Sequence, residues 1–73
     1  MAQEIIEVPI TGKIISVDTN VGDEVQEGDV ICFLESMKME NPILAPVNGM
    51  ITDIQVAVGE VVETGKVIAI IEY

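Results

Sequence analysis

The chain has 73 residues, of which 49% are hydrophobic and only 3% are aromatic. It carries 13 acidic residues against three lysines, with no arginine and no histidine, so its formal net charge is −10 at pH 7. That charge repels nucleic-acid phosphates and anionic lipid headgroups, so we expect neither nucleic-acid binding nor direct membrane insertion. The acidic balance either keeps a very apolar chain in solution or steers it towards a basic partner surface.

Valine and isoleucine dominate the apolar residues, and glycine recurs through most of the chain. This pattern favours strands over helices, and the length suits one domain, which we take as residues 1–73. Glycine, asparagine and aspartate between the apolar runs mark the turns. The expected strands span, in chain order, Glu4–Val8, Gly12–Asp18, Glu24–Gln26, Val30–Glu35, Asn41–Ala45, Gly49–Val56, Val61–Glu63 and Val67–Glu72.

The sequence repeats itself with a shift of 37 positions, so that residues 6–35 align without a gap on residues 43–72. Eleven aligned pairs are identical, whereas composition alone predicts about three. Those pairs are Ile6/Ile43, Pro9/Pro46, Gly12/Gly49, Ile14/Ile51, Val21/Val58, Gly22/Gly59, Val25/Val62, Gly28/Gly65, Val30/Val67, Ile31/Ile68 and Glu35/Glu72. Two copies of one supersecondary unit are therefore expected to pack about an approximate two-fold axis.

The repeat predicts an all-β fold in which two copies of four short strands pack on each other. Ile14 and Val17 are apolar but three positions apart, which breaks the alternation expected of a strand. Ile51 and Ile54 break it at the same place in the second copy. A β-bulge in each copy accounts for this break. Paired glycines in the turns predict a positive φ at Gly22 and Gly28 and at their counterparts in the second copy.

The residues offer no catalytic constellation. Cys32 is the only cysteine, which excludes an internal disulfide, and its apolar surroundings predict a buried, inert thiol. No metal-ligand set is recognisable without histidine, and the adjacent acids Asp23 and Glu24 lie in a turn. We therefore expect a protein that is not itself an enzyme.

Lys38 is the most informative residue, in the segment Glu35-Ser36-Met37-Lys38-Met39-Glu40. Its repeat counterpart would lie beyond residue 73, so the segment joins the two copies and is expected at an exposed hairpin tip, opposite the termini. A primary amine on a flexible stem is a usual attachment point for acyl groups. On the residues alone, Lys38 can equally be a solvated turn lysine, and Met37 and Met39 can pack onto the hairpin.

A duplicated half-barrel with Met-Lys-Met at the joining turn resembles the biotinyl (biotin carboxyl carrier) domains of biotin-dependent carboxylases and decarboxylases. The resemblance covers nearly the whole chain, and it implies a flattened β-barrel or sandwich of two four-stranded antiparallel sheets, a barrel-sandwich hybrid. The motif departs from the family at Ser36, where alanine is common, and at Pro9-Ile10-Thr11-Gly12, where many members have Pro-Met-Pro-Gly. The turn at residues 20–22 leaves no room for the protruding thumb of some members, so the chain is similar to the thumbless type.

The resemblance implies that a biotin ligase joins biotin to Lys38 as an amide, with Met37 and Met39 as the flanking motif. It further implies that the carrier moves a carboxyl group between a biotin carboxylase and a carboxyltransferase or decarboxylase, in the cytoplasm. Two alternatives remain. One is a lipoyl carrier, although lipoyl turns usually have aspartate before the lysine and alanine after it. The other is an unmodified barrel that acts as an interaction module.

Overall fold

The structure is a computed structural model that describes all 73 residues. It contains eight strands and no helix, so no helical segment is available to cross a membrane. The strands are β1 (Gln3–Glu7), β2 (Gly12–Val17), β3 (Glu24–Val25), β4 (Val30–Ser36), β5 (Met39–Leu44), β6 (Gly49–Ile54), β7 (Val61–Val62) and β8 (Val67–Glu72).

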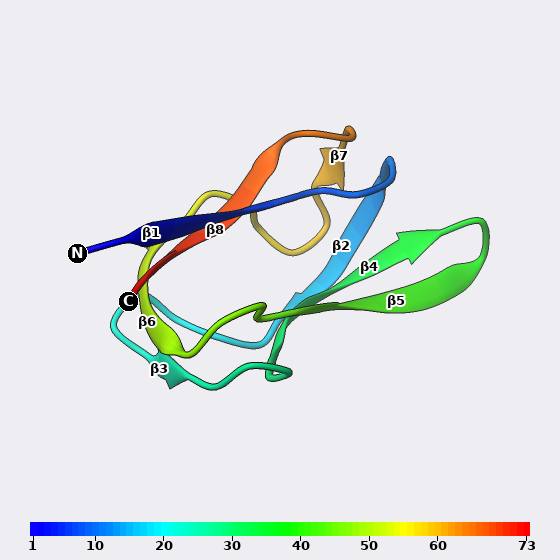
Figure 1. The fold of residues 1–73 in the computed structure, drawn as a ribbon. Helices are drawn as coiled ribbons and strands as arrows, with labels where there is room; N and C mark the ends of the chain where they lie inside the picture. Colours follow the sequence, from blue (N-terminus) through cyan, green and yellow to red (C-terminus); the bar gives the residue numbers. More distant parts are fainter.

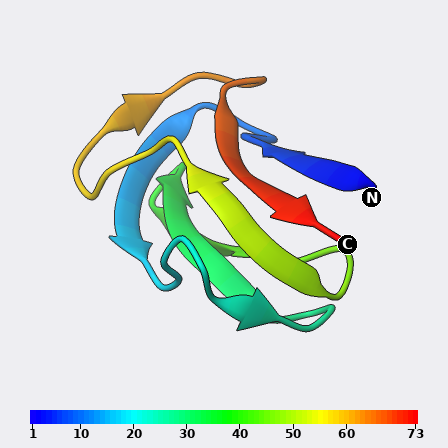
Figure 2. The same cartoon turned by 90° about the vertical axis from the view of Figure 1, so that its left-hand side faces the viewer.

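The strands form two four-stranded antiparallel sheets, with the orders β1-β8-β6-β3 and β5-β4-β2-β7. Each sheet takes two strands from each sequence copy, because β1 to β4 belong to the first copy and β5 to β8 to the second. Figure 2 shows the strands curving around a shared interior. The expected fold class, a flattened barrel sandwich with an internal two-fold, is confirmed.

A bulge interrupts the same strand in each copy. The β2–β4 register shifts between Ile14 and Ser16, and the β6–β8 register shifts between Ile51 and Asp53. Ile14 and Ile51 precede the bulges and are fully buried. Each bulge changes which side chains face the interior only in the residues that follow it. The expected bulge at this strand is confirmed in each copy. A second pair of register shifts lies between Val30 and Cys32 and between Ile6 and Glu7.

The turns of each copy bond to the strands of the other copy. The Gly22 amide donates to the Ile51 carbonyl at 2.8 Å, and the repeat-related Gly59 amide donates to the Ile14 carbonyl at 2.7 Å. In the opposite direction, the Ile51 amide donates to the Asp23 carbonyl and the Ile14 amide donates to the Glu60 carbonyl, both at 2.9 Å. The expected positive φ values hold at all four turn glycines, Gly22, Gly28, Gly59 and Gly65.

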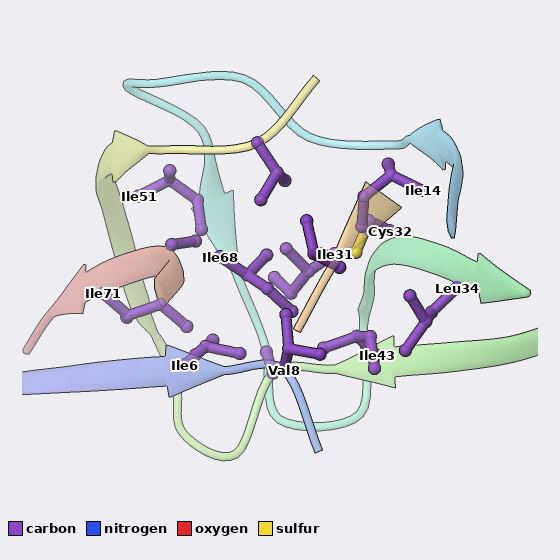
Figure 3. Packing of buried hydrophobic residues seen from close by; sticks show 14 of the residues in the cluster. Ile6, Val8, Ile14, Ile31, Cys32, Leu34, Ile43, Ile51, Ile68 and Ile71 are labelled. Atoms are coloured by element: carbon purple, nitrogen blue, oxygen red, sulfur yellow. The ribbon is translucent and has the colours of Figure 1, made fainter. Parts of the chain in front are cut away.

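A cluster of 15 buried apolar residues fills the space between the sheets. Its centre is built from repeat-related pairs, since Ile14, Ile31, Ile51 and Ile68 are all fully buried. Figure 3 shows these side chains converging from both sheets, with the Cys32 sulfur among them.

The two chain ends lie side by side at one end of the barrel (Figure 1). The backbones of Ala2 and Tyr73 exchange two hydrogen bonds of 2.9 Å, which extend the β1–β8 pairing to both ends of the chain.

Cys32 is fully buried and unpaired, as expected. Burial raises the pKa of its thiol to about 11, and the nearby Asp18 carboxylate adds to the rise. The thiol therefore stays protonated and unreactive in the folded protein at neutral pH.

This burial makes folding sensitive to alkaline pH. The unfolded thiol ionises near its ordinary pKa of 9.0 while the folded one resists ionisation up to about 11. The stabilising contribution of the neutral thiol is complete below pH 9 and is lost as the pH rises through this window. We expect the free energy of unfolding, measured with urea, to fall more steeply between pH 9 and 11 in the wild type than in Cys32→Ala. A constant difference between the two proteins from pH 8 to 11 would contradict this.

Candidate functional site

The candidate site is the tip of the β4–β5 hairpin, which extends from the barrel at the end opposite the termini (Figure 1). The expected strands ended at Glu35 and began again at Asn41, but pairing continues to Ser36 opposite Met39. Only Met37 and Lys38 remain to form the turn. The longer ladder carries Lys38 beyond the first residues of the neighbouring strand β2.

The turn holds both of its residues in the left-handed region. Met37 has φ of 54° and Lys38 has φ of 65°, and no other non-glycine residue in the protein has a positive φ. A two-residue hairpin loop with both φ values positive is a type I′ turn, for which Asn-Gly is the favoured sequence. For other side chains this conformation costs about 1–2 kcal/mol per residue. The tip is therefore locally strained.

Side-chain hydrogen bonds fix the base of the tip to the barrel. The Ser36 hydroxyl donates to the Thr11 carbonyl at 3.1 Å, just beyond the point where β2 stops pairing with β4. The Asn41 amide donates to the carbonyls of Met39 at 3.2 Å and Leu34 at 3.4 Å. Sequence reasoning treated Ser36 only as a departure from a motif and did not single out Thr11 or Asn41. Their hydroxyl and amide groups beside the turn were the available signal.

Lys38 and both flanking methionines are exposed. Met37 is 84% exposed and Met39 is 66% exposed, so neither side chain is buried against the hairpin. Lys38 takes part in no ion pair, whereas Lys66 pairs with Glu60 at 3.5 Å. The third lysine, Lys13, lies on β2 within the outer face of a sheet.

The surroundings of Lys38 contain carboxylates but no partner for catalysis. Glu35 on β4 lies opposite Glu40 on β5. On its other side, Glu35 lies opposite Lys13 on β2. No three metal-ligating side chains lie together. An acyl group on the Lys38 amine would displace no ion pair. The tip therefore fits a covalently attached group, and it suits presentation of that group more than chemistry on it.

A two-fold barrel with an exposed lysine at one projecting hairpin defines a carrier domain for an attached cofactor. A family model described as "Biotin-requiring enzyme", of biotin and lipoyl domains, matches residues 4–71. The chain therefore belongs to the biotin/lipoyl attachment family, as a non-catalytic biotinyl carrier domain. The expectation of biotin as its cofactor is confirmed at the level of the family.

The relatives include a carboxylase chain, a decarboxylase subunit and a biotinylated protein. The chain is 54% identical over 37 residues to the propionyl-CoA carboxylase alpha chain of Ruegeria pomeroyi, covering 51% of this chain and 5% of that one. It is 49% identical over 39 residues to glutaconyl-CoA decarboxylase subunit gamma of Acidaminococcus fermentans, a match that covers 53% of this chain and 27% of that subunit. It is 44% identical over 45 residues to biotinylated protein TB7.3 of Mycobacterium tuberculosis, a match that covers 62% of each of the two chains.

Solved structures agree with this assignment. The urea carboxylase of Kluyveromyces lactis contains a matching domain with a TM-score of 0.91 and 30% identity, which covers 99% of this chain and 6% of that enzyme. A single-chain, multi-domain long-chain acyl-CoA carboxylase matches with a TM-score of 0.88 and 25% identity, covering 93% and 7%. The chain thus spans only a small part of these enzymes.

The strain at the tip predicts that the turn sequence is not optimal for stability. The double variant Met37→Asn, Lys38→Gly places the favoured type I′ residues in the same turn. We expect it to raise the free energy of unfolding by about 1–3 kcal/mol, because asparagine and glycine adopt positive φ at lower cost. Urea denaturation measures the change, and Met39→Asn, in the extended strand, serves as the control that gains nothing. A double variant no more stable than the wild type would mean that the turn stores no strain.

Proposed function

We propose that this chain is a biotin carboxyl carrier in which biotin is joined as an amide to Lys38. The observation that carries the proposal is the position of this amine, exposed and free of ion pairs at the apex of the projecting hairpin. Family membership supplies the cofactor, and the three-lysine composition leaves only Lys13 and Lys66 as competitors. Both competitors lie outside the projecting hairpin.

The role of Lys38 is that of a nucleophile towards an activated carboxyl carbon. Its amine loses a proton, forms the amide bond and releases the activating group, a reaction that a biotin ligase would drive with ATP. The fixed turn limits where the amine is found, while its four-carbon stem leaves it mobile enough to enter a partner's pocket. When attached, biotin supplies a ring nitrogen that carries a carboxyl group.

The partners in this proposal are a biotin ligase, a biotin carboxylase, and a carboxyltransferase or decarboxylase, acting in the cytoplasm. The relatives named as carboxylase and decarboxylase components support this range. Tethering on a small rigid domain raises the local concentration of the carried group to about the millimolar range. The barrel then acts as the handle by which successive enzymes receive the group.

Lys38→Arg is the decisive substitution, since it keeps the charge and removes the acylatable amine. We expect complete loss of biotin incorporation after co-expression with a biotin ligase, with an unchanged β-sheet circular dichroism spectrum. Lys13→Arg and Lys66→Arg are the matched controls and should incorporate biotin as the wild type does. Intact-mass spectrometry reads the result and separates a biotinyl from a lipoyl group. Biotin incorporation that persists in Lys38→Arg would mean that another lysine is the attachment site. A mass increase that matches a lipoyl group would mean that the cofactor is lipoate and not biotin.

We further propose that Met37 and Met39 provide adaptable apolar contacts to several partners. Thioether side chains are soft and unbranched, which suits surfaces that meet more than one protein. Met37→Gln and Met39→Gln should each slow biotin incorporation about tenfold, the loss that roughly 1.4 kcal/mol of binding represents. Met50→Gln, on β6, controls for a general effect of replacing a partly exposed methionine. If all three variants incorporated biotin at the wild-type rate, Met37 and Met39 would contribute nothing to recognition of the turn.

A further inference from the structure

We propose that the ring end of the group carried on Lys38 rests on its own domain, in a hollow beside the base of the hairpin. This inference depends on the proposed function, because it concerns biotin attached at that residue. The hollow measures about 250 Å³ and lies between β2, the end of β4 and the loop that leads into β7. It is lined by Lys13, Ile14, Ile15, Glu35, Val58 and Gly59.

The internal repeat indicates that this hollow is specific to the side that bears Lys38. The two-fold relates Val58 to Val21, which is similarly exposed, but it relates Lys13 to Met50. No depression occurs where the repeat would place a second hollow. The protein's other depression lies along β3 and the start of β6. It includes Met50 but none of the other counterparts of the hollow's lining residues, and its charged residues are acidic. A hollow that combines a lysine, a glutamate and apolar side chains thus occurs once, and it adjoins the carrier hairpin.

The chemistry of the hollow matches the ring system of biotin. A cyclic urea presents one carbonyl acceptor and two N–H donors, and the fused thioether ring presents an apolar face. Lys13 offers ammonium donors and Glu35 offers a carboxylate acceptor. These two residues face each other across β2 and β4 but form no ion pair, so both head groups are free to bind. Val58, 65% exposed, supplies an apolar wall.

The attached arm is long enough to reach the hollow. Glu35 lies three residues before Lys38, which corresponds to roughly 10 Å along a strand. The lysine stem and the acyl chain of biotin together span about eleven bonds, or roughly 14 Å when extended. Because the arm is tethered, its ring is present at about millimolar local concentration, so even a weak site is occupied for much of the time.

Nuclear magnetic resonance of the ¹⁵N,¹³C-labelled chain, compared before and after biotinylation, tests the inference. We expect backbone amide shifts to change at Lys13, Ile15, Val58 and Gly59 as well as at the tip. We also expect nuclear Overhauser effects between the biotin ring protons and the Val58 methyl groups. The repeat-related Val21 should show neither change. Intact mass on the same sample reports whether the biotinyl group is present.

Variants separate docking from propagated effects. Val58→Ser should lose the shift changes at Lys13 on biotinylation, whereas Val21→Ser, its counterpart in the other copy, should retain them. Lys13→Gln should weaken the ring contacts to Val58 without reducing incorporation of biotin.

Full biotinylation with shift changes confined to residues 36–39 and no ring contact to Val58 would overturn the inference. The same holds if the hollow responds only when a partner protein is added. A sample without the biotinyl mass would instead contradict the proposed function.

Discussion

The exchange of backbone hydrogen bonds between the two copies is the constraint on which the rest of the structure depends. The Gly22 turn is bonded to β6, and the Gly59 turn is bonded to β2, so each half supplies the groups that satisfy the other. A buried backbone amide or carbonyl without a partner is costly. Neither half can therefore keep its turns in place without the other. The result is one cooperative unit whose interior is closed by both copies.

That rigidity explains why a strained tip is tolerated. Two side chains in the left-handed region would destabilise an isolated hairpin, and strain of this kind persists where the surrounding structure over-determines it. Here β4 lies within its sheet, while Ser36 and Asn41 bond the two arms of the hairpin to neighbouring backbone. The strain is located at the residue proposed to be acylated. The fold has given up a small part of its stability at the point where an amine is displayed.

Much of the fold could be read from the sequence, because the repeat leaves a strong signal. Identical residues at a fixed shift revealed the two-fold, the turn glycines and the position of the joining hairpin. The broken alternation at Ile14 and Val17 revealed a bulge. The length of the hairpin was not readable, because Met37-Lys38 is not a sequence favoured in the two-residue type I′ turn that pairs Ser36 with Met39. The orientation of the two methionines was equally hidden, because strand parity has no meaning across a turn with positive φ.

Side-chain partners at the site were also beyond sequence reasoning. The Thr11 hydroxyl accepts a hydrogen bond from the Thr64 amide at 3.3 Å, and Asn48, its repeat counterpart, accepts one from the Glu27 amide at 2.7 Å. Threonine and asparagine do not align as identical residues, yet they perform the same task. Lys13 opposite Glu35 is a similar case, since only the β2–β4 register brings them together.

The pairing of Ala2 with Tyr73 has a consequence for protein engineering. Because the second residue is already hydrogen-bonded to the last, a few added residues would close this chain into a ring. The ring could then be opened at a different exposed loop, such as residues 46–48, to give a circular permutant with the same barrel. In such a permutant the new ends, and anything fused to them, would leave the domain from a chosen face, while the β4–β5 turn stays intact.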